Sequence, residues 1–486
     1  MHVLAARPPV PSLLVCFPRC PYPGRPPMRH WFVRRLLRLF RVVSRVSLWF
    51  ETRFTVTGGL VIGGTIAAAV FGVDPRQTLA YLLAAVLVSV IAIAMGLSLF
   101  WRPQLELKRE LPDTVTVDSP TSYTVLIRNH STRSEYNLVI SDELRTIYPS
   151  ADTFQRAATN ARDRSLNWFD RRIGFPRWLD LLRTGRGAHL KPIPVPMIPA
   201  HAMIEVTIPL TPLRRGKLIF TSLEIKRPDP MGIFFAKHRV KAYGELVSLP
   251  KRYPVPPLQW ISQRHFHRGG VALAATVGDS EEFIGVRDYR PGDPLRHIHW
   301  RSFAKRGAPV VKEHQDEFFD RHALVIDTFL GHSPPAHFEA AIAVAASFIQ
   351  CTRPHDSILD LVFIEQKVWQ ITTGRGLSNN RRVLTYLAEL QYSHTDNFDH
   401  LAAYLRRYLD QLASIIMVGT TWDTTRQVFV KELHHRQLRC RALQISESDV
   451  RTTDLSRTAP GASGAEPQTI RPSMIEHDIA HLATLG

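Results

Sequence analysis

The sequence predicts a membrane-anchored α/β multidomain protein, in which a helical hairpin precedes an antiparallel β-sandwich and a doubly wound α/β domain. Three observations predict this order: two long uncharged apolar runs, then segments with apolar residues at every second position, then segments that alternate between strand and helix patterns. The chain has 486 residues, of which 45% are hydrophobic, so it is long enough to form several domains with their own cores.

The two apolar runs, residues 54–73 and 79–100, contain no charged side chain. A helix of about 20 residues spans roughly 30 Å, the thickness of the apolar part of a bilayer. Because only a short connection separates the runs, residues 54–101 are predicted to be a transmembrane hairpin. Gly59, Gly63 and Ala67 are expected to let its helices approach closely. A buried helix pair or a cleaved signal peptide fits less well, because both runs are apolar on every face and the first begins far from Met1.

The net charge of +18 is concentrated before the first run, where residues 1–53 hold ten arginines and a single acid, Glu51. By the positive-inside rule, this basic segment and the bulk of the chain are expected to be cytoplasmic, in a two-pass protein of the cell inner membrane. The stretch from Met28 is typical of a basic amphipathic helix on an anionic leaflet, which makes membrane lipid an expected partner. Either Met1 or Met28 fits as the true start. The four cysteines are sparse, which favours a reducing compartment.

Residues 102–252 are predicted to form an immunoglobulin-like β-sandwich, since Tyr123, Val125 and Ile127 exemplify its period-two pattern. An insertion at about 151–195 mixes aromatic and basic residues, and two interpretations remain open. It is either an interfacial element on the membrane or a helical insertion that packs on the sandwich. The alternating strand and helix patterns of residues 322–450 predict a mostly parallel sheet, and residues 451–486 are predicted to be a flexible tail.

Between these domains, residues 273–320 contain the sequence "FIGVRDYRPGDPLRHIHWRSFAKRG". It predicts a strand, a turn, a helix capped by Asp293 and ended by Gly307, and a second strand. On one α-helix, His297 and His299 would point about 200° apart, which argues against a shared metal ion. The favoured interpretation is a structural brace between the sandwich and the sheet. A partner-docking surface, catalysis and nucleic-acid binding are the alternatives.

This segment resembles the signature of a widespread bacterial family, the domain of unknown function numbered fifty-eight. The segments "RRGKL" and "PDPMGIF" resemble that family too, and "SFAK", with Phe303 between Ser302 and Ala304, is a departure from its pattern. The signature residues, which are also candidates for partner contact, are Glu282, Phe283, Arg287, Tyr289, Gly292, Asp293, Ile298, Trp300, Ser302 and Lys305.

The resemblance implies a von Willebrand factor A-like C-terminal domain. It also implies partnership with a MoxR-type AAA+ ATPase and with a transglutaminase-like membrane protein, in protein or complex assembly. In such domains Asp-x-Ser-x-Ser binds a metal ion after the first strand. Here only Asp327 of that set is present, because Phe329 and Gly331 lack hydroxyls. The degenerate site predicts no metal and no cofactor.

The expected function is therefore that of a non-enzymatic inner-membrane scaffold or adaptor. A metal-dependent hydrolase that uses Asp327 is one alternative, and a nucleic-acid-binding membrane protein is a second. Nucleic acid is the less expected partner, because the basic residues are not interleaved with exposed aromatics along one face.

Overall fold

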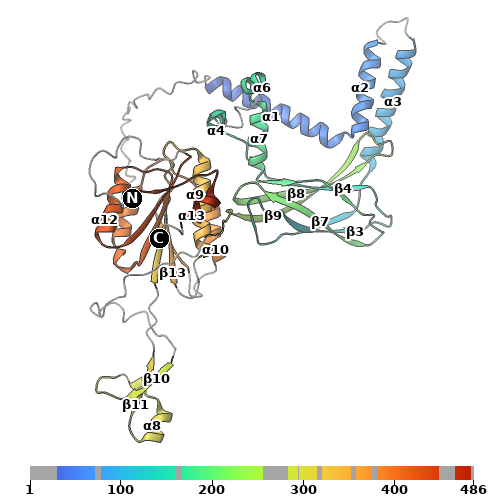
Figure 1. The fold of residues 1–486 in the computed structure, drawn as a ribbon. Coiled ribbons are helices and arrows are strands. Elements are labelled where there is room, and N and C mark those ends of the chain that lie inside the picture. Colours follow the sequence, from blue (N-terminus) through green and yellow to red (C-terminus); the bar gives the residue numbers. More distant parts are fainter. Residues whose placement is uncertain are drawn as a thin grey trace, which may run out of the picture. The chain divides into compact units, whose positions relative to one another are not determined.

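The structure is a computed structural model whose chain divides into two compact units (Figure 1). The first unit comprises Met1–Val88, Tyr148–Leu182 and Gly232–Phe234, and the second comprises Ser89–Ile147, Arg183–Met231 and Phe235–Gly486. The residues that the structure describes are 30–71, 78–159, 167–255, 283–293, 295–314, 320–351, 357–373, 380–447 and 466–482.

Three helices begin the described chain: α1 (His30–Arg53), α2 (Val56–Phe71) and α3 (Thr78–Phe100). Within α3, the 22 residues Leu79–Phe100 are apolar enough and numerous enough to cross a membrane. The first predicted span is shorter than expected, because α2 has 16 residues and a length of about 24 Å. Residues 72–77, including the end of the predicted run, lie outside the described part.

The start of α2 explains why the first span is shorter. Phe54 forms an isolated antiparallel bridge with Phe234, which takes it out of the helix. The Thr55 hydroxyl donates to the carbonyl of Gly232 and accepts from the amide of Gly58, so Thr55 caps α2. A Cβ at Gly58 would clash with the Ile233 carbonyl oxygen, so this contact requires glycine. The segment "PDPMGIF" thus supplies the acceptor that fixes the start of the helix.

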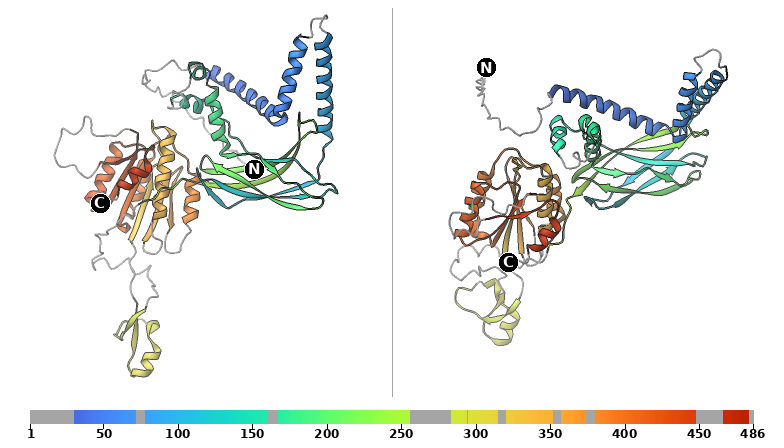
Figure 2. Two further views of the ribbon diagram at one scale, coloured as in Figure 1. Left: turned by 45° about the vertical axis from the view of Figure 1, so that its right-hand side comes forward. Right: turned by 45° about the horizontal axis from the view of Figure 1, so that its top comes forward.

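The close approach between α2 and α3 involves other residues than predicted. A Cβ built on Gly64 would lie 4.0 Å from the Leu87 side chain, whereas one on Gly59 or Gly63 would meet no atom of the described chain within 4 Å. The two helices run side by side in Figures 1 and 2. The small-residue stripe therefore exists, but the face that contacts α3 is rotated by about one residue.

The predicted insertion is helical, with α4 (Ala151–Arg156), the 3-10 turn η1 (Ala157–Thr159), α6 (Trp168–Ile173) and α7 (Phe175–Arg186). It shares a core with α1, in which Phe154 and Trp178 are fully buried. The Trp178 indole nitrogen donates to the Ser44 hydroxyl of α1 over 2.8 Å, which satisfies both buried polar groups. The packing of the insertion on α1 was not foreseen from the sequence.

Two sheets that share one core form the β-rich domain. The first has the order β1-β3-β7-β5, and the second has the order β2-β9-β8-β4-β6. All pairings are antiparallel except the short β2–β9 pair. Strands β5 and β6 belong to these sheets, so the helical insertion ends earlier than residue 195. The strands are β1 (Leu105–Glu110), β2 (Thr114–Thr116), β3 (Thr121–Asn129), β4 (Leu138–Leu144), β5 (Ala188–Leu190), β6 (Ile193–Val195), β7 (Met203–Pro212), β8 (Gly216–Pro228) and β9 (Phe235–Leu249).

The α/β domain has a six-stranded sheet in the order β14-β13-β12-β15-β16-β17, parallel except for the antiparallel edge strand β14. Helices α9, α10 and α13 supply the core on one face, and α11 and α12 supply it on the other. The elements are β12 (Asp320–Ile326), α9 (Pro335–Cys351), β13 (Ser357–Ile364), β14 (Val368–Thr373), α10 (Asn380–Glu389), α11 (Phe398–Arg406), β15 (Ser414–Gly419), α12 (Thr424–His435), β16 (Arg439–Ile445), β17 (Gln468–Ile470) and α13 (Ile475–His481).

The flexible-tail prediction is wrong for the end of the described chain. Strand β17 pairs in parallel with β16, and α13 packs on the same core as α9. Ile470 and Ile479 are fully buried. Four apolar positions, Ile470, Ile475, Ile479 and Leu482, suffice to add these elements to the sheet, although the segment before them is poor in apolar residues.

Arg215, from the "RRGKL" segment between β7 and β8, joins the β-sandwich to the α/β domain. Its buried guanidinium donates to both carboxylate oxygens of Glu339 on α9, at 3.1 and 3.2 Å. It also donates to the carbonyls of Leu387 and Leu390 at the end of α10. Those carbonyls belong to the set that a helix leaves without intrahelical partners. Burial lowers the pKa of Arg215, and the nearby Glu339 carboxylate opposes that shift.

We expect Arg215→Ala to destabilise the contact between the two domains by roughly 2 kcal/mol, because it leaves helix-end carbonyls without donors. The measurement is hydrogen–deuterium exchange of the amides of α10 in the full chain, which should become faster. Arg381→Ala is the matched control, since Arg381 pairs with Asp113 at an exposed site and its loss should cost less than about 1 kcal/mol. Equal exchange in both variants would contradict the role of Arg215.

Candidate functional site

The candidate site lies where the central strands β12 and β15 end at the carboxyl edge of the sheet. In chain order the sheet of this domain runs 3-2-1-4-5-6, so its direction of winding reverses between β12 and β15. Open sheets of this kind bind ligands at that reversal, outside the carboxyl ends of the strands. Asp327 directly follows β12, and Thr420 directly follows β15.

The guanidinium of Arg426 occupies this position. Its side chain is 1% exposed, and it donates from Nε to Asp327 over 2.6 Å. Its terminal nitrogens donate to both oxygens of Asp396, each over 3.1 Å, and to Asp423 over 2.5 Å. The guanidinium carbon lies 4.6 Å from the ring centre of Phe398, which completes its enclosure. Three carboxylates thus surround a cation that the chain itself supplies.

Local helix chemistry positions these carboxylates. Asp423 is the N-cap of α12, and its carboxylate accepts from the Arg426 amide. Asp396 accepts from the Phe398 amide at the start of α11. Asp327 lies in the loop after β12, and its second oxygen accepts from the amide of Phe329. The strand end and the two helix starts therefore converge on one guanidinium.

The electrostatics of the pair follow from its burial. Burial alone would lower the pKa of Arg426, but Asp327 and Asp396 outweigh this effect and raise it. Burial also raises the pKa of Asp327, and the ion pair with Arg426 opposes that rise. The partly exposed Asp396 has a lowered pKa, since hydrogen bonds from Arg426 and the Phe398 amide outweigh its desolvation. The arginine is therefore a permanent positive charge at this edge.

Phe329 and Gly331, at the positions of the degenerate ion site, and the hydroxyl residues of the neighbouring loops make other contacts. The ring centre of Phe329 lies 5.5 Å from the Arg426 guanidinium carbon, and Gly331 adopts a positive φ of 57°. The Ser393 hydroxyl donates to the Thr395 carbonyl, and the Thr420 hydroxyl donates to the Phe329 carbonyl. Among the residues that the structure describes, no group of three or more His, Cys, Asp or Glu side chains is placed to hold a metal ion.

The signature segment forms a separate small motif. Strand β10 (Phe283–Asp288) pairs antiparallel with β11 (Val310–His314), and a 3-10 turn, η3 (Leu295–His297), and α8 (Trp300–Arg306) lie between them. The single predicted helix is wrong. Ile298 instead forms a bridge with Val311, and α8 begins only after His299. Ile298, Val310 and Val311 are buried, so their contact explains why the helix is interrupted.

Arg287 and Asp293 close the turn of this motif. The two guanidinium nitrogens of Arg287 donate to the two carboxylate oxygens of Asp293 over 2.7 and 2.8 Å. Asp293 also accepts from the Arg290 amide, so it closes the turn instead of capping the predicted helix. The hydrogen bonds from Arg287 and Arg290 lower the pKa of Asp293 to about 2. Gly292 has a φ of +108°, which the turn requires.

The other signature residues are divided between contacts within the motif and exposed positions. Tyr289 is half-buried and its amide donates to the Pro309 carbonyl, while the Ser302 hydroxyl lies 2.7 Å from His299 Nδ1. Trp300 is 64% exposed and Lys305 is exposed. Phe283 begins β10, and Glu282 lies outside the described residues. Residues 256–282 and 315–319, on either side of the motif, also lie outside them, so the brace between domains stays a prediction.

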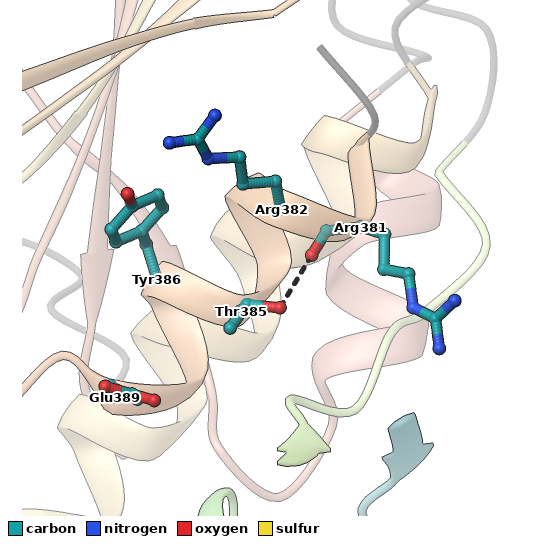
Figure 3. Close-up of a pocket in the computed structure, with 5 residues that line it drawn as sticks. All are labelled: Arg381, Arg382, Thr385, Tyr386 and Glu389. Atoms are coloured by element: carbon teal, nitrogen blue, oxygen red, sulfur yellow. Dashed lines mark hydrogen bonds between the residues drawn. The ribbon is translucent and has the colours of Figure 1, made fainter. Parts of the chain in front are cut away.

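A surface hollow of about 480 Å³ on α10 offers another place for a ligand (Figure 3). All of its lining residues, Arg381, Arg382, Thr385, Tyr386 and Glu389, come from that one helix. The Thr385 hydroxyl donates to the Arg381 carbonyl within the helix, and the two arginine side chains point in different directions. This divergent arrangement lacks the converging polar groups of a small-molecule site.

Arg426 was missed in the sequence, although one signal could have revealed it. An arginine in the first turn of a helix faces the positive end of the helix dipole, which is unfavourable without compensation. Arg426 stands three residues after the N-cap Asp423, and a nearby carboxylate is the compensation that this position requires.

We expect Arg426→Ala to lower the free energy of unfolding of the α/β domain by about 3–5 kcal/mol, because Asp327 then stays buried without a counter-charge. The destabilisation should shrink as pH falls towards about 4, the pKa of an unfolded aspartate. Burial raises the pKa of Asp327 in the folded state, so the folded variant binds a proton more readily than the unfolded chain does. Protonation of Asp327 therefore stabilises the folded variant at low pH, and this stabilisation is lost as pH rises through the raised pKa. Hydrogen–deuterium exchange of β12 and β15 amides measures this.

The matched control is Arg406→Ala, which removes a partly exposed pair with Glu432 between α11 and α12 and should cost less than about 1 kcal/mol. A double variant, Asp327→Leu with Arg426→Leu, should recover much of the lost stability because it removes both buried charges. An Arg426→Ala variant as stable as Arg406→Ala would show that the buried pair is not needed.

No protein-family model matches the chain. It is similar to the uncharacterised protein YeaD of Bacillus subtilis (strain 168), with 23% identity over 201 residues, which cover 40% of this chain and 47% of YeaD. The match thus spans about half the length of that relative. Among solved structures, the chain is similar to PapD-like domain 7 of human CEP192 (15% identity, TM-score 0.17, 30% of this chain and 86% of that chain). It is also similar to a CARDB domain of Pyrococcus furiosus (11% identity, TM-score 0.14, 30% and 95%). With TM-scores this low, the similarity to these two structures supports no conclusion about fold or function.

Proposed function

We propose that the protein is a non-enzymatic scaffold or adaptor of the cell inner membrane. Its helices α2 and α3 cross the bilayer as a two-pass hairpin, and the β-sandwich and the α/β domain are cytoplasmic. The apolar helix α3 and the arginines that precede α2 support this topology. The observation that carries the functional proposal is the Arg426 guanidinium at the ligand position of the sheet.

The occupied position favours binding over chemistry. Each oxygen of Asp327 already accepts a hydrogen bond, one from Arg426 and one from the Phe329 amide. A hydrolase mechanism would need this carboxylate to hold a metal ion or move a proton, and either role would require Arg426 to leave. The strand order, with its antiparallel edge strand, supports the von Willebrand factor A-like assignment of this domain.

We place the partner contact on the signature motif. Leu295 and Trp300 are 67% and 64% exposed beside the basic residues Arg301 and Lys305. Of these residue types, tryptophan and arginine are enriched at protein interfaces, so Trp300 and Arg301 are the strongest candidates for contact. The partner proposed from the family resemblance is a MoxR-type AAA+ ATPase, with a transglutaminase-like membrane protein as a further component. The closed turn of Arg287 and Asp293 would present this surface as a rigid unit.

The test is co-purification of the full chain, in detergent, with the MoxR-type ATPase of the same organism and a slowly hydrolysed ATP analogue. We expect a stable complex that Trp300→Ala weakens at least tenfold, as removal of a central interface aromatic does. Tyr243→Ala, on the exposed part of β9, is the control and should bind normally. Failure of the unmodified chain to retain the ATPase would refute the proposed partner.

A further inference from the structure

Helix α1 presents three different faces along its 24 residues, and one of them is buried against described residues of its unit. The covered face carries Val33, Leu37, Phe40 and Ser44, which follow one another at helical spacing and are all buried. They pack against Phe154, Trp178 and Leu182 of the helical insertion. The insertion therefore fixes α1 through this face, and Arg41 beside it stacks on the Tyr148 ring, with its guanidinium carbon 4.6 Å from the ring centre.

A second face of α1 is apolar but exposed. Its six side chains recur at positions i, i+3, i+4, i+7, i+10 and i+11, the spacing of one helix stripe. They are Leu39, Val42, Val43, Val46, Trp49 and Phe50, between 43% and 57% exposed. A contiguous exposed apolar stripe of this length marks a surface that is covered by a partner or by a membrane.

The third face is basic and lies between the other two. Arg34, Arg38, Arg41 and Arg45 again follow helical spacing, and the helix contains one acid, Glu51. An apolar stripe flanked by arginines is typical of a helix that lies in the plane of an anionic membrane surface. There the apolar side chains enter the acyl boundary and the guanidinium groups meet lipid phosphates.

We propose that α1 lies in the interface of an anionic bilayer, with the Leu39–Phe50 stripe in the acyl boundary and the insertion clamped on its protein-facing side. The proposal rests on the proposed membrane anchorage. Continuity with the anchor selects a bilayer as the occupant, because only Phe54 and Thr55 separate α1 from α2. The arginine face selects anionic lipid. Trp49 and Phe50 stand at the end nearest the anchor, where amphipathic aromatics favour the interface.

The contacts that fix the start of α2 also hold the adjoining end of α1 in place. The Phe50 and Phe54 rings stack 5.2 Å apart, and Phe54 pairs with Phe234, so the chain leaves α1 through an ordered corner. On the insertion, Trp168 and Phe169 of α6 are 70% and 61% exposed. These aromatics are further candidates for lipid contact, and α1 binds with or without them.

The experiment places the photo-reactive residue p-benzoylphenylalanine at single positions of the full chain, reconstituted in vesicles. One set of vesicles is pure phosphatidylcholine, and the other contains phosphatidylglycerol as well. At Val43 we expect a covalent lipid adduct, detected as a mass increase of the protein, that is several-fold more abundant in the anionic vesicles. The same residue at Leu37, on the covered face, should cross-link within the chain.

Two further positions separate the possible failures. Leu83 of α3 is 53% exposed and reports on the anchor, while Tyr243 of the β-sandwich is 79% exposed and gives the background. Lipid adducts at Leu83 with only background at Val43 would overturn the interfacial role of α1 but keep the anchorage. Background at both positions would refute the anchorage itself. Cross-linking of Val43 to another protein would also overturn the proposal, as would equal adducts in both lipids.

A charge variant tests the arginine face separately. In Arg38→Gln with Arg45→Gln, both exposed positions lose their charge while the apolar stripe stays intact. We expect the several-fold advantage of anionic vesicles at Val43 to be lost, because each basic side chain near such a surface contributes about 1 kcal/mol, which is about fivefold in a binding equilibrium. The Leu83 adduct should not change. An unchanged lipid preference at Val43 would contradict the role of the arginines.

Discussion

The α/β domain depends on one buried guanidinium that cannot lose its charge. Arg426 is enclosed at the reversal point of the sheet, so its hydrogen-bond donors need acceptors there. Asp327, Asp396 and Asp423 provide them from a strand end and from two helix starts. The requirement therefore fixes how β12, α11 and α12 meet. It also fills the position where related architectures receive a ligand.

Polar side chains also hold other parts of the chain together, by donating hydrogen bonds to backbone carbonyls. Arg215, in the connection between β7 and β8, donates hydrogen bonds to the free carbonyls at the end of α10. Thr55 uses the carbonyls of Gly232 and Ile233 to begin α2. In both cases a polar side chain meets backbone acceptors that secondary structure leaves open. The segments "RRGKL" and "PDPMGIF" thus lie at junctions, and their sequences can be understood from the groups that they satisfy.

The sequence predicted the features that depend on periodicity. Apolar residues at every second position identified the sandwich, and alternating strand and helix patterns identified the α/β domain. The uncharged run of α3 identified the apolar helix. Features that depend on tertiary contact were mispredicted. The bridge of Ile298 to Val311 breaks the expected helix, and the bridge of Phe54 to Phe234 shortens the first apolar helix. One of the two central residues of the site was identified from the sequence. Asp327 directly follows a predicted strand, whereas Arg426 lies 99 residues further along the chain and reaches Asp327 only in the folded domain.

The most direct test of a site filled by its own arginine is a titration of the purified full chain with Mn²⁺, followed by electron paramagnetic resonance of the free ion. The Arg426 contacts predict no saturable binding at millimolar Mn²⁺, because the guanidinium already occupies the position between the three carboxylates and donates hydrogen bonds to each of them. Binding of one equivalent that disappears in Asp327→Asn would contradict this occupancy. It would then favour metal chemistry at Asp327 over a scaffold that acts by contact alone.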